Sequence, residues 1–86
     1  MQIHFHRWFD KRFAKLPKKI QDKAIERIQL FRADPFNSAL ANHALTGRYS
    51  GSRSINISGD YRAIYDPLPN DTALFIDIGT HSQLYK

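Results

Sequence analysis

The sequence predicts an α+β fold in which a helical hairpin packs on a small, mostly antiparallel twisted sheet. Three observations support this fold. An alternating apolar segment opens the chain at residues 2–6, and apolar residues at helical spacing fill residues 7–33. Three more alternating segments follow at residues 53–57, 61–65 and 74–78, separated by Gly, Pro, Asn and Asp. The expected order of elements is therefore β-α-α-β-β-β.

The length and composition favour a single domain spanning residues 1–86. A chain of 86 residues buries only about 60% of its unfolded surface, so one small core must hold it together. The absence of Cys excludes disulfides and thiolate metal sites, and it fits a reducing cytoplasm. The first twenty residues contain no apolar run long enough for a signal peptide or a membrane span. We therefore expect a soluble cytoplasmic protein with no membrane partner.

The positive charge is concentrated at the start of the chain. Residues 1–33 hold nine Lys or Arg against three acids, a net charge of +6, whereas residues 34–86 hold four against five, a net charge of −1. A basic surface of this kind favours polyanions such as nucleic acids, although many ordinary domains are equally basic.

The first segment reads as a short strand. Ile3 and Phe5 alternate with His4 and His6, so the apolar pair faces inward and the two histidines share the other face. Because the sequence offers no third ligand nearby, a solvated pair is expected there and no metal site is predicted.

Two helices are expected next. Residues 7–16 place Phe9, Phe13 and Leu16 on one face. From Lys18 the helical spacing resumes in an apolar stripe made of Ile20, Ala24, Ile25, Ile28 and Phe31. The second helix must end at Asp34, because the residue before a proline is disfavoured in the α region.

A ridge of like charge flanks the apolar stripe of the second helix. Lys19, Lys23 and Arg27 lie four residues apart, an arrangement that costs a few tenths of a kcal/mol per pair in an isolated helix. The ridge either binds RNA phosphates or an acidic partner, or it is a solvated face whose charge is balanced by Asp22 and Glu26. We predict the first.

The later segments predict two hairpins. A three-residue loop of Ser58, Gly59 and Asp60 would place Ile57 opposite Tyr61, Ile55 opposite Ala63, and Asn56 beside Arg62. One side of this hairpin would then serve the core. The other side, which carries Ser54 and Asn56, would be free for chemistry.

The end of the chain gathers reactive groups. The last strand stops at Gly79, and Thr80, His81, Ser82 and Tyr85 follow immediately. Functional side chains commonly lie where a rigid element gives way to a loop. We expect a site here.

Several short motifs in a fixed order resemble the RelE/ParE toxin superfamily, and within it the YafQ-type toxins. They are Asn42-His43, Leu45-Thr46-Gly47, residues 53–57, residues 60–65 and residues 78–85. The resemblance implies a bacterial type II toxin that enters the A site of the 30S ribosomal subunit, contacts rRNA and cuts translated mRNA. It also implies inhibition by a cognate antitoxin.

The resemblance also suggests which residues form the site. The matching positions are His43, Asp60, His81 and Tyr85. Two departures stand out, because the pattern often has an acid where this chain has Ser54 and a histidine where it has Asn56. Tyr85 also stands where the pattern has Phe.

The chemistry of RNA cleavage can be distributed over these groups without a metal or cofactor. The 2′-OH must lose a proton, the phosphate gains charge, and the leaving 5′-oxygen gains a proton. Imidazole, with an unperturbed pKa of about 6.5, can perform either transfer, so His43 and His81 form the expected pair with the base unassigned. Asp60 would orient an imidazole.

The remaining candidates would bind RNA. Arg62 or Arg53 would neutralise the phosphate through its guanidinium fork. Tyr85 would stack on a base or donate a hydrogen bond, and Asn56 would position the substrate. Asp60, Tyr85 and Arg53 also have plain structural readings, as a turn residue, a core aromatic and a sheet-edge side chain.

Two alternatives remain on the same fold: a ParE-like toxin that binds a topoisomerase, and a catalytically silent RNA-binding or antitoxin-binding domain. The combination of His43, Asp60 and His81 favours the nuclease, because a pure binder needs no proton-transfer pair. An acidic, partly disordered antitoxin is the expected protein partner.

Overall fold

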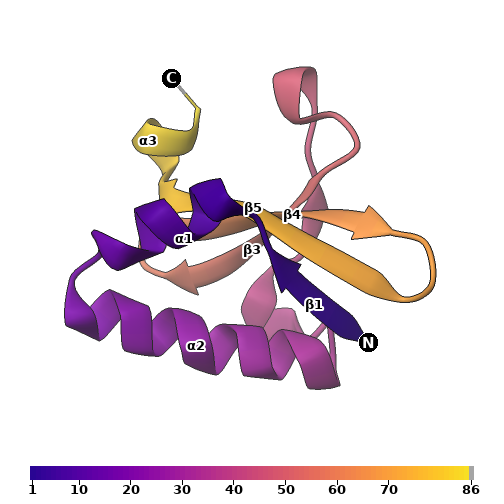
Figure 1. The fold of residues 1–86 in the computed structure, drawn as a ribbon, viewed down its shortest axis with the longest axis horizontal. Coiled ribbons are helices and arrows are strands. Elements are labelled where there is room, and N and C mark those ends of the chain that lie inside the picture. The colour runs from indigo at the N-terminus through magenta and orange to yellow at the C-terminus, as the bar shows by residue number, and fades with distance from the viewer. Residues whose placement is uncertain (86) are drawn as a thin grey trace.

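The computed structural model describes residues 1–85 and consists of a five-stranded mixed sheet with helices on both sides (Figure 1). The strand order is β1-β5-β4-β3-β2, with β1 parallel to β5 and every other pair antiparallel. The strands are β1 (Gln2–Phe5), β2 (His43–Ala44), β3 (Arg53–Ser58), β4 (Tyr61–Leu68) and β5 (Thr72–Thr80). The predicted α+β fold with a mostly antiparallel sheet is therefore confirmed.

Helices α1 (Arg7–Ala14) and α2 (Lys18–Ala33) form the predicted hairpin and lie on one side of the sheet. His6 begins α1 as its N-cap, because its Nδ1 accepts a hydrogen bond from the Trp8 amide at 3.0 Å. The helix ends earlier than the predicted Leu16, although this leucine still packs against the core. The second helix ends as predicted, with Asp34 in an extended conformation (φ −153°) before the proline.

The core between the helices and the sheet is aromatic. Phe75 lies at its centre, with its ring 5.4 to 5.9 Å from the rings of Phe5, Phe9, Phe31 and Tyr65. Such pairs add about 0.5–1.5 kcal/mol each beyond the area they bury. The packing of these rings fixes β5 against both helices.

Ile25 does not belong to this core. Ala24, Ile28 and Phe31 are buried as predicted, but Ile25 remains 50% exposed. One residue along an α-helix turns the side chain through about 100°, so Ile25 falls beyond the edge of the stripe that faces the sheet.

The β3–β4 register differs from the prediction at its turn. Ile55 pairs with Ala63 and Asn56 with Arg62, as expected. The predicted pairing of Ile57 with Tyr61 is wrong, because Ser58 takes that place. Ile57 is the extra residue of a β-bulge, which leaves its side chain buried while the chain turns through two residues.

Short elements that the sequence did not predict complete the fold. They are the 3₁₀ turns η1 (Ser38–Leu40) and η2 (Gly47–Tyr49), strand β2 within the expected loop, and the single-turn helix α3 (His81–Leu84). In Figure 1, α3 and the loop that carries η2 rise from the face of the sheet opposite α2. Among residues 1–85, no helix is long and apolar enough to cross a membrane.

Candidate functional site

An open, polar cleft of about 400 Å³ lies between α3 and the segment that contains β2. Eight residues line it: His43, Ala44, Leu45, Thr46, Ser54, Arg62, His81 and Tyr85. Two histidines from distant parts of the chain therefore share one cleft, together with a guanidinium and a phenol. Leu45 and Thr46 were not singled out as site residues by sequence reasoning, because neither carries a titratable group.

His43 is held in one orientation by the backbone. It sits in the short strand β2 opposite Ser54, and its Nδ1 lies 2.9 Å from the carbonyl oxygen of Ala41. A carbonyl can only accept a hydrogen bond, so Nδ1 carries the proton. In the neutral ring Nε2 is then left with a free lone pair, which is the form a general base requires.

Ser54 lines the same cleft from β3. The residue is fully buried, and its hydroxyl has no hydrogen-bond partner within residues 1–85. A buried hydroxyl without a partner costs free energy that a bound polar group would recover.

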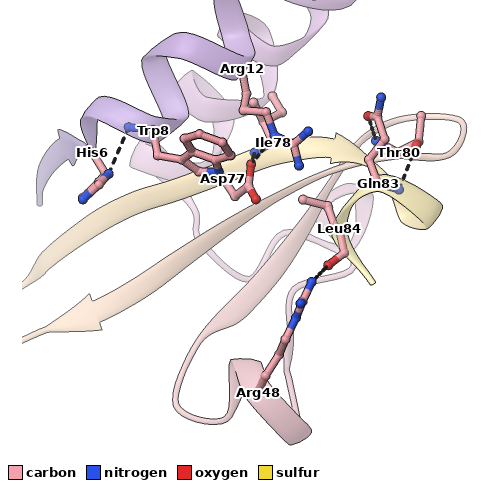
Figure 2. Close-up of polar contacts among 9 residues, drawn as sticks. All are labelled: His6, Trp8, Arg12, Arg48, Asp77, Ile78, Thr80, Gln83 and Leu84. Atoms are coloured by element: carbon pink, nitrogen blue, oxygen red, sulfur yellow. Dashed lines mark hydrogen bonds and ion pairs between the residues drawn. The ribbon is translucent and has the colours of Figure 1, made fainter. Parts of the chain in front are cut away.

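The backbone around His81 is fixed by a capping box at the start of α3. Thr80 Oγ1 accepts from the Gln83 amide at 3.3 Å, and Gln83 Oε1 accepts from the Thr80 amide at 2.8 Å (Figure 2). Gly79 permits this arrangement, because a Cβ at that position would lie 2.7 Å from Gln83 Oε1. The His81 amide also donates to the carbonyl of Asp60 at 3.1 Å.

Tyr85 packs its ring 4.7 Å from that of His81 and edge-on to Tyr49 at 5.7 Å. Arg48 completes the arrangement: its guanidinium lies 5.1 Å from the Tyr49 ring centre, and Nη2 donates to the carbonyl of Leu84 at 2.6 Å (Figure 2). The η2 loop and α3 thus hold each other. Sequence reasoning missed Arg48 and Tyr49, and its only signal was a cation and an aromatic inside a Gly- and Ser-rich stretch.

Asp60, Asn56 and Arg53, which were predicted as site residues, do not line the cleft. Asp60 is exposed in the β3–β4 turn and contacts His81 through its backbone, not its carboxylate. Asn56 lies on β3 opposite Arg62 and on the same face of the strand as Ser54, but it does not line the cleft itself. Arg53 lies on the helix side, where its Nε donates to Asn42 Oδ1 at 2.8 Å and its guanidinium covers the Phe36 ring at 5.2 Å.

These contacts favour the structural interpretation of Arg53, and its role as a phosphate ligand stays a prediction. Alternation along β3 explains the outcome, because Arg53 shares its face with the buried Ile55 while Ser54 points to the cleft. Arg62 is the guanidinium at the cleft, and its Nη1 donates to the carbonyl of Gly59 at 2.8 Å.

Helix α2, which carries the predicted ridge, lies on the side of the sheet opposite α3 (Figure 1), and α3 is one of the elements that border the cleft. Lys23 Nζ is 3.5 Å from Glu26 Oε1, and Arg27 has its Nε buried without a partner in the described chain. Lys19, Lys23 and Arg27 are therefore separate from the cleft, and a role in binding RNA stays a prediction. In the described part of the chain no three His, Cys, Asp or Glu side chains are grouped to hold a metal ion.

We compared the chain with known protein families and with curated proteins. The profile of the family described as "Bacterial toxin of type II toxin-antitoxin system, YafQ" matches residues 1–86. No curated protein matches the chain by sequence.

The solved structures that share the fold include three from E. coli and Agrobacterium tumefaciens. The crystal structure of YafQ from Escherichia coli strain BL21(DE3) has a TM-score of 0.82 at 21% identity, covering 99% of this chain and 98% of that chain. A chain of the E. coli DinJ-YafQ toxin-antitoxin complex has a TM-score of 0.77 at 20% identity, covering 99% of this chain and 97% of that chain. A YoeB/ParE toxin from Agrobacterium tumefaciens gives 0.77 at 16% identity, covering 94% and 99%.

Proposed function

The chain belongs to the YafQ family of bacterial type II toxins, and from this premise we propose that it is a ribosome-dependent endoribonuclease that cuts mRNA in the A site. The observation that carries this proposal is the convergence of His43 and His81 on one cleft with Arg62 and Tyr85. Two imidazoles beside a guanidinium supply the proton transfers and the charge stabilisation that RNA cleavage needs.

His43 acts as the general base. Its Nδ1–H is held by the Ala41 carbonyl, so Nε2 is the atom that removes the proton from the 2′-OH. The 2′-oxygen then attacks the adjacent phosphorus, and the bond from phosphorus to the 5′-oxygen breaks. His81, in its protonated form, donates a proton to the leaving 5′-oxygen, which gives a 2′,3′-cyclic phosphate and a 5′-OH end.

The other cleft residues bind and orient the substrate. Arg62 offsets the charge that the phosphate gains in the transition state. Tyr85 stacks on a base beside His81. Asp60 acts through its carbonyl, which positions the His81 backbone.

The ribosome completes the site. The cleft is open and polar, so it has no walls that would hold a flexible mRNA by themselves. Binding in the 30S A site would fix the strand, and the basic surface of residues 1–33 would contact rRNA. Lys19, Lys23 and Arg27 are candidates for such contacts, on the side of the molecule away from the cleft.

The test is to express the protein in bacteria and map mRNA 5′ ends. We expect cuts within translated frames that fall by about 10²–10⁴-fold in His81→Ala and in His43→Ala. The exposed His4→Ala is the matched control and should cut normally. Growth arrest that persists in His81→Ala would contradict the proposal, and arrest with intact transcripts and inhibited supercoiling would favour a ParE-like topoisomerase-binding toxin.

We also propose that its antitoxin is acidic and partly disordered. An E. coli YafQ has been crystallised with DinJ in a toxin-antitoxin complex, which supports an antitoxin as the protein partner. A hollow of about 280 Å³ between α1 and α2 would accept apolar side chains of the antitoxin. Phe13, Ile25 and Ile28 help to line it. Affinity for the antitoxin should fall as salt is raised, measured by titration calorimetry. An affinity independent of ionic strength would contradict the acidic partner.

A further inference from the structure

A half-exposed tryptophan marks the outward face of α1. Trp8 is the only Trp in the chain and is 49% exposed. The same helix carries four cations, namely Arg7, Lys11, Arg12 and Lys15. Among residues 1–85, Arg7, Lys11 and Lys15 form no ion pair. A flat aromatic ring surrounded by unpaired cations is the combination that binds single-stranded nucleic acid.

The tryptophan is held in place by a fixed arginine. Arg12 Nε lies 3.0 Å from the carboxylate of the buried Asp77, and its guanidinium carbon is 5.6 Å from the centre of the Trp8 ring. Figure 2 shows these three side chains where α1 crosses β5. A ring held in this way loses little conformational entropy when a base stacks on it.

A ring contact between Tyr49 and Tyr85 links the surface around Trp8 to the cleft. A hollow of about 420 Å³ joins Trp8 to Tyr49, and Tyr49 in turn packs edge-on against Tyr85, which lines the cleft. Two acids face this hollow, and both are engaged: Asp66 accepts from the Ser52 hydroxyl and Asp77 from Arg12. The rings of His81, Tyr85, Tyr49 and Trp8 thus lie in succession from the cleft to α1.

We propose that Tyr49, Trp8 and the α1 cations form a subsite for single-stranded RNA that continues from the cleft. Bases stack on the two rings, while Lys11 and Lys15 neutralise the phosphates. The subsite rests on the proposed nuclease function, because it extends the path of the same strand. An acidic polypeptide would use the cations but would gain less from a flat exposed ring, so RNA is the better occupant.

The experiment measures RNA binding without cleavage. Protein carrying His81→Ala is titrated with a labelled RNA of about ten nucleotides, a length that spans several bases, and anisotropy gives the affinity. We expect Trp8→Ala in this background to bind about 5- to 100-fold more weakly, as loss of a stacked base implies. Phe36→Ala is the matched control, because it removes another exposed aromatic on the helix side, where Phe36 lies under Arg53.

Two further ligands identify the occupant. An abasic oligomer of equal length and charge should bind more weakly than the RNA and should lose little affinity in Trp8→Ala. Equal affinity of the RNA for Trp8→Ala and its parent would overturn the subsite, and so would poly-glutamate that competes as well as RNA. Because these measurements need no cleavage, they can fail while mRNA cutting by the unmutated protein succeeds, or hold while cutting fails.

Discussion

The two faces of the sheet are held by different forces. The helix face is an aromatic and aliphatic core in which Phe75 contacts four other rings. On the cleft face, the fully buried apolar side chains that lie outside this core cluster are Ile64 and Leu84. The shape of the cleft face comes instead from caps and side-chain hydrogen bonds, such as those of Thr80, Gln83 and Arg48.

This difference separates stability from function. Substitutions in the core of the helix face lower the stability of the protein, because each removed side-chain group leaves a cavity. The cleft face gains little from burial, so it can carry an unpaired hydroxyl at Ser54 and exposed imidazoles at modest cost. Substitutions on the first face should therefore unfold the protein, whereas those on the second should impair its activity first.

The net charge differs between the first and the second part of the chain. The net +6 of residues 1–33 lies in the part that forms β1, α1 and α2, whereas the residues lining the cleft all come from the part with a net charge of −1. The proposed function therefore assigns the attraction of RNA and its cleavage to different segments of the chain, which allows each to be altered independently.

Phe75→Ala should have the largest effect on stability. Removing a fully buried aromatic at the centre of the core costs about 3–5 kcal/mol, which is a large part of the stability of a small domain. Urea unfolding followed by circular dichroism measures it. The exposed Phe36→Ala should cost less than about 0.5 kcal/mol, and equal losses in the two variants would contradict the contrast between the faces.

Asn42→Ala tests the hydrogen bonds that anchor the segment before β2 at the boundary between the two faces. Asn42 Nδ2 donates to the Pro35 carbonyl at 2.8 Å and to the Tyr65 hydroxyl at 2.9 Å, while its Oδ1 accepts from Arg53. Truncation leaves these part-buried groups without a partner, so we expect a loss of about 1–3 kcal/mol. Because His43 follows directly in the chain, mRNA cutting should fall as well.

Tyr65→Phe is the control for Asn42→Ala, because it removes only one of the three hydrogen bonds of Asn42 and keeps the aromatic ring. It should cost about 1 kcal/mol and leave cutting nearly normal. If Tyr65→Phe were as damaging as Asn42→Ala, the amide would not be the anchor of the segment before β2.

The helix face could be predicted from the sequence, because periodicity reports which side chains share a face. The positions of Phe9, Ala24, Ile28 and Phe31 follow from spacing alone. Ile25 was misplaced because spacing does not give the width of the buried stripe. The β3–β4 turn was misplaced because a bulge leaves no mark in an alternating pattern.

The cleft could be predicted only in part. His43, Ser54, Arg62, His81 and Tyr85 do line it, and they were reached through motifs and strand alternation. Arg48 and Tyr49 were missed because their role depends on contacts with α3 across the fold, at positions with no periodic pattern. Asp60 shows the reverse case, since its contact with His81 is made by a backbone carbonyl that any residue would supply.

Gly79→Ala should have a small effect on stability and a clear effect on activity. A methyl group at Gly79 would meet Gln83 Oε1 at 2.7 Å and Gln83 Cβ at 3.4 Å. The flexible amide can move away, but it then gives up its hydrogen bond to the Thr80 amide. The loss of this cap should cost about 1 kcal/mol, while mRNA cutting falls further because His81 begins the helix that the cap orients.

A double-mutant cycle separates this mechanism from general strain. Gln83→Ala removes both the obstacle and the capping amide, so adding Gly79→Ala to it should change the free energy of unfolding by little more than the uncertainty of the measurement. Fully additive losses would mean that the methyl group clashes with something other than Gln83. The cleft face would then be packed as tightly around β5 as the helix face, and the separation of stability from activity would not hold there.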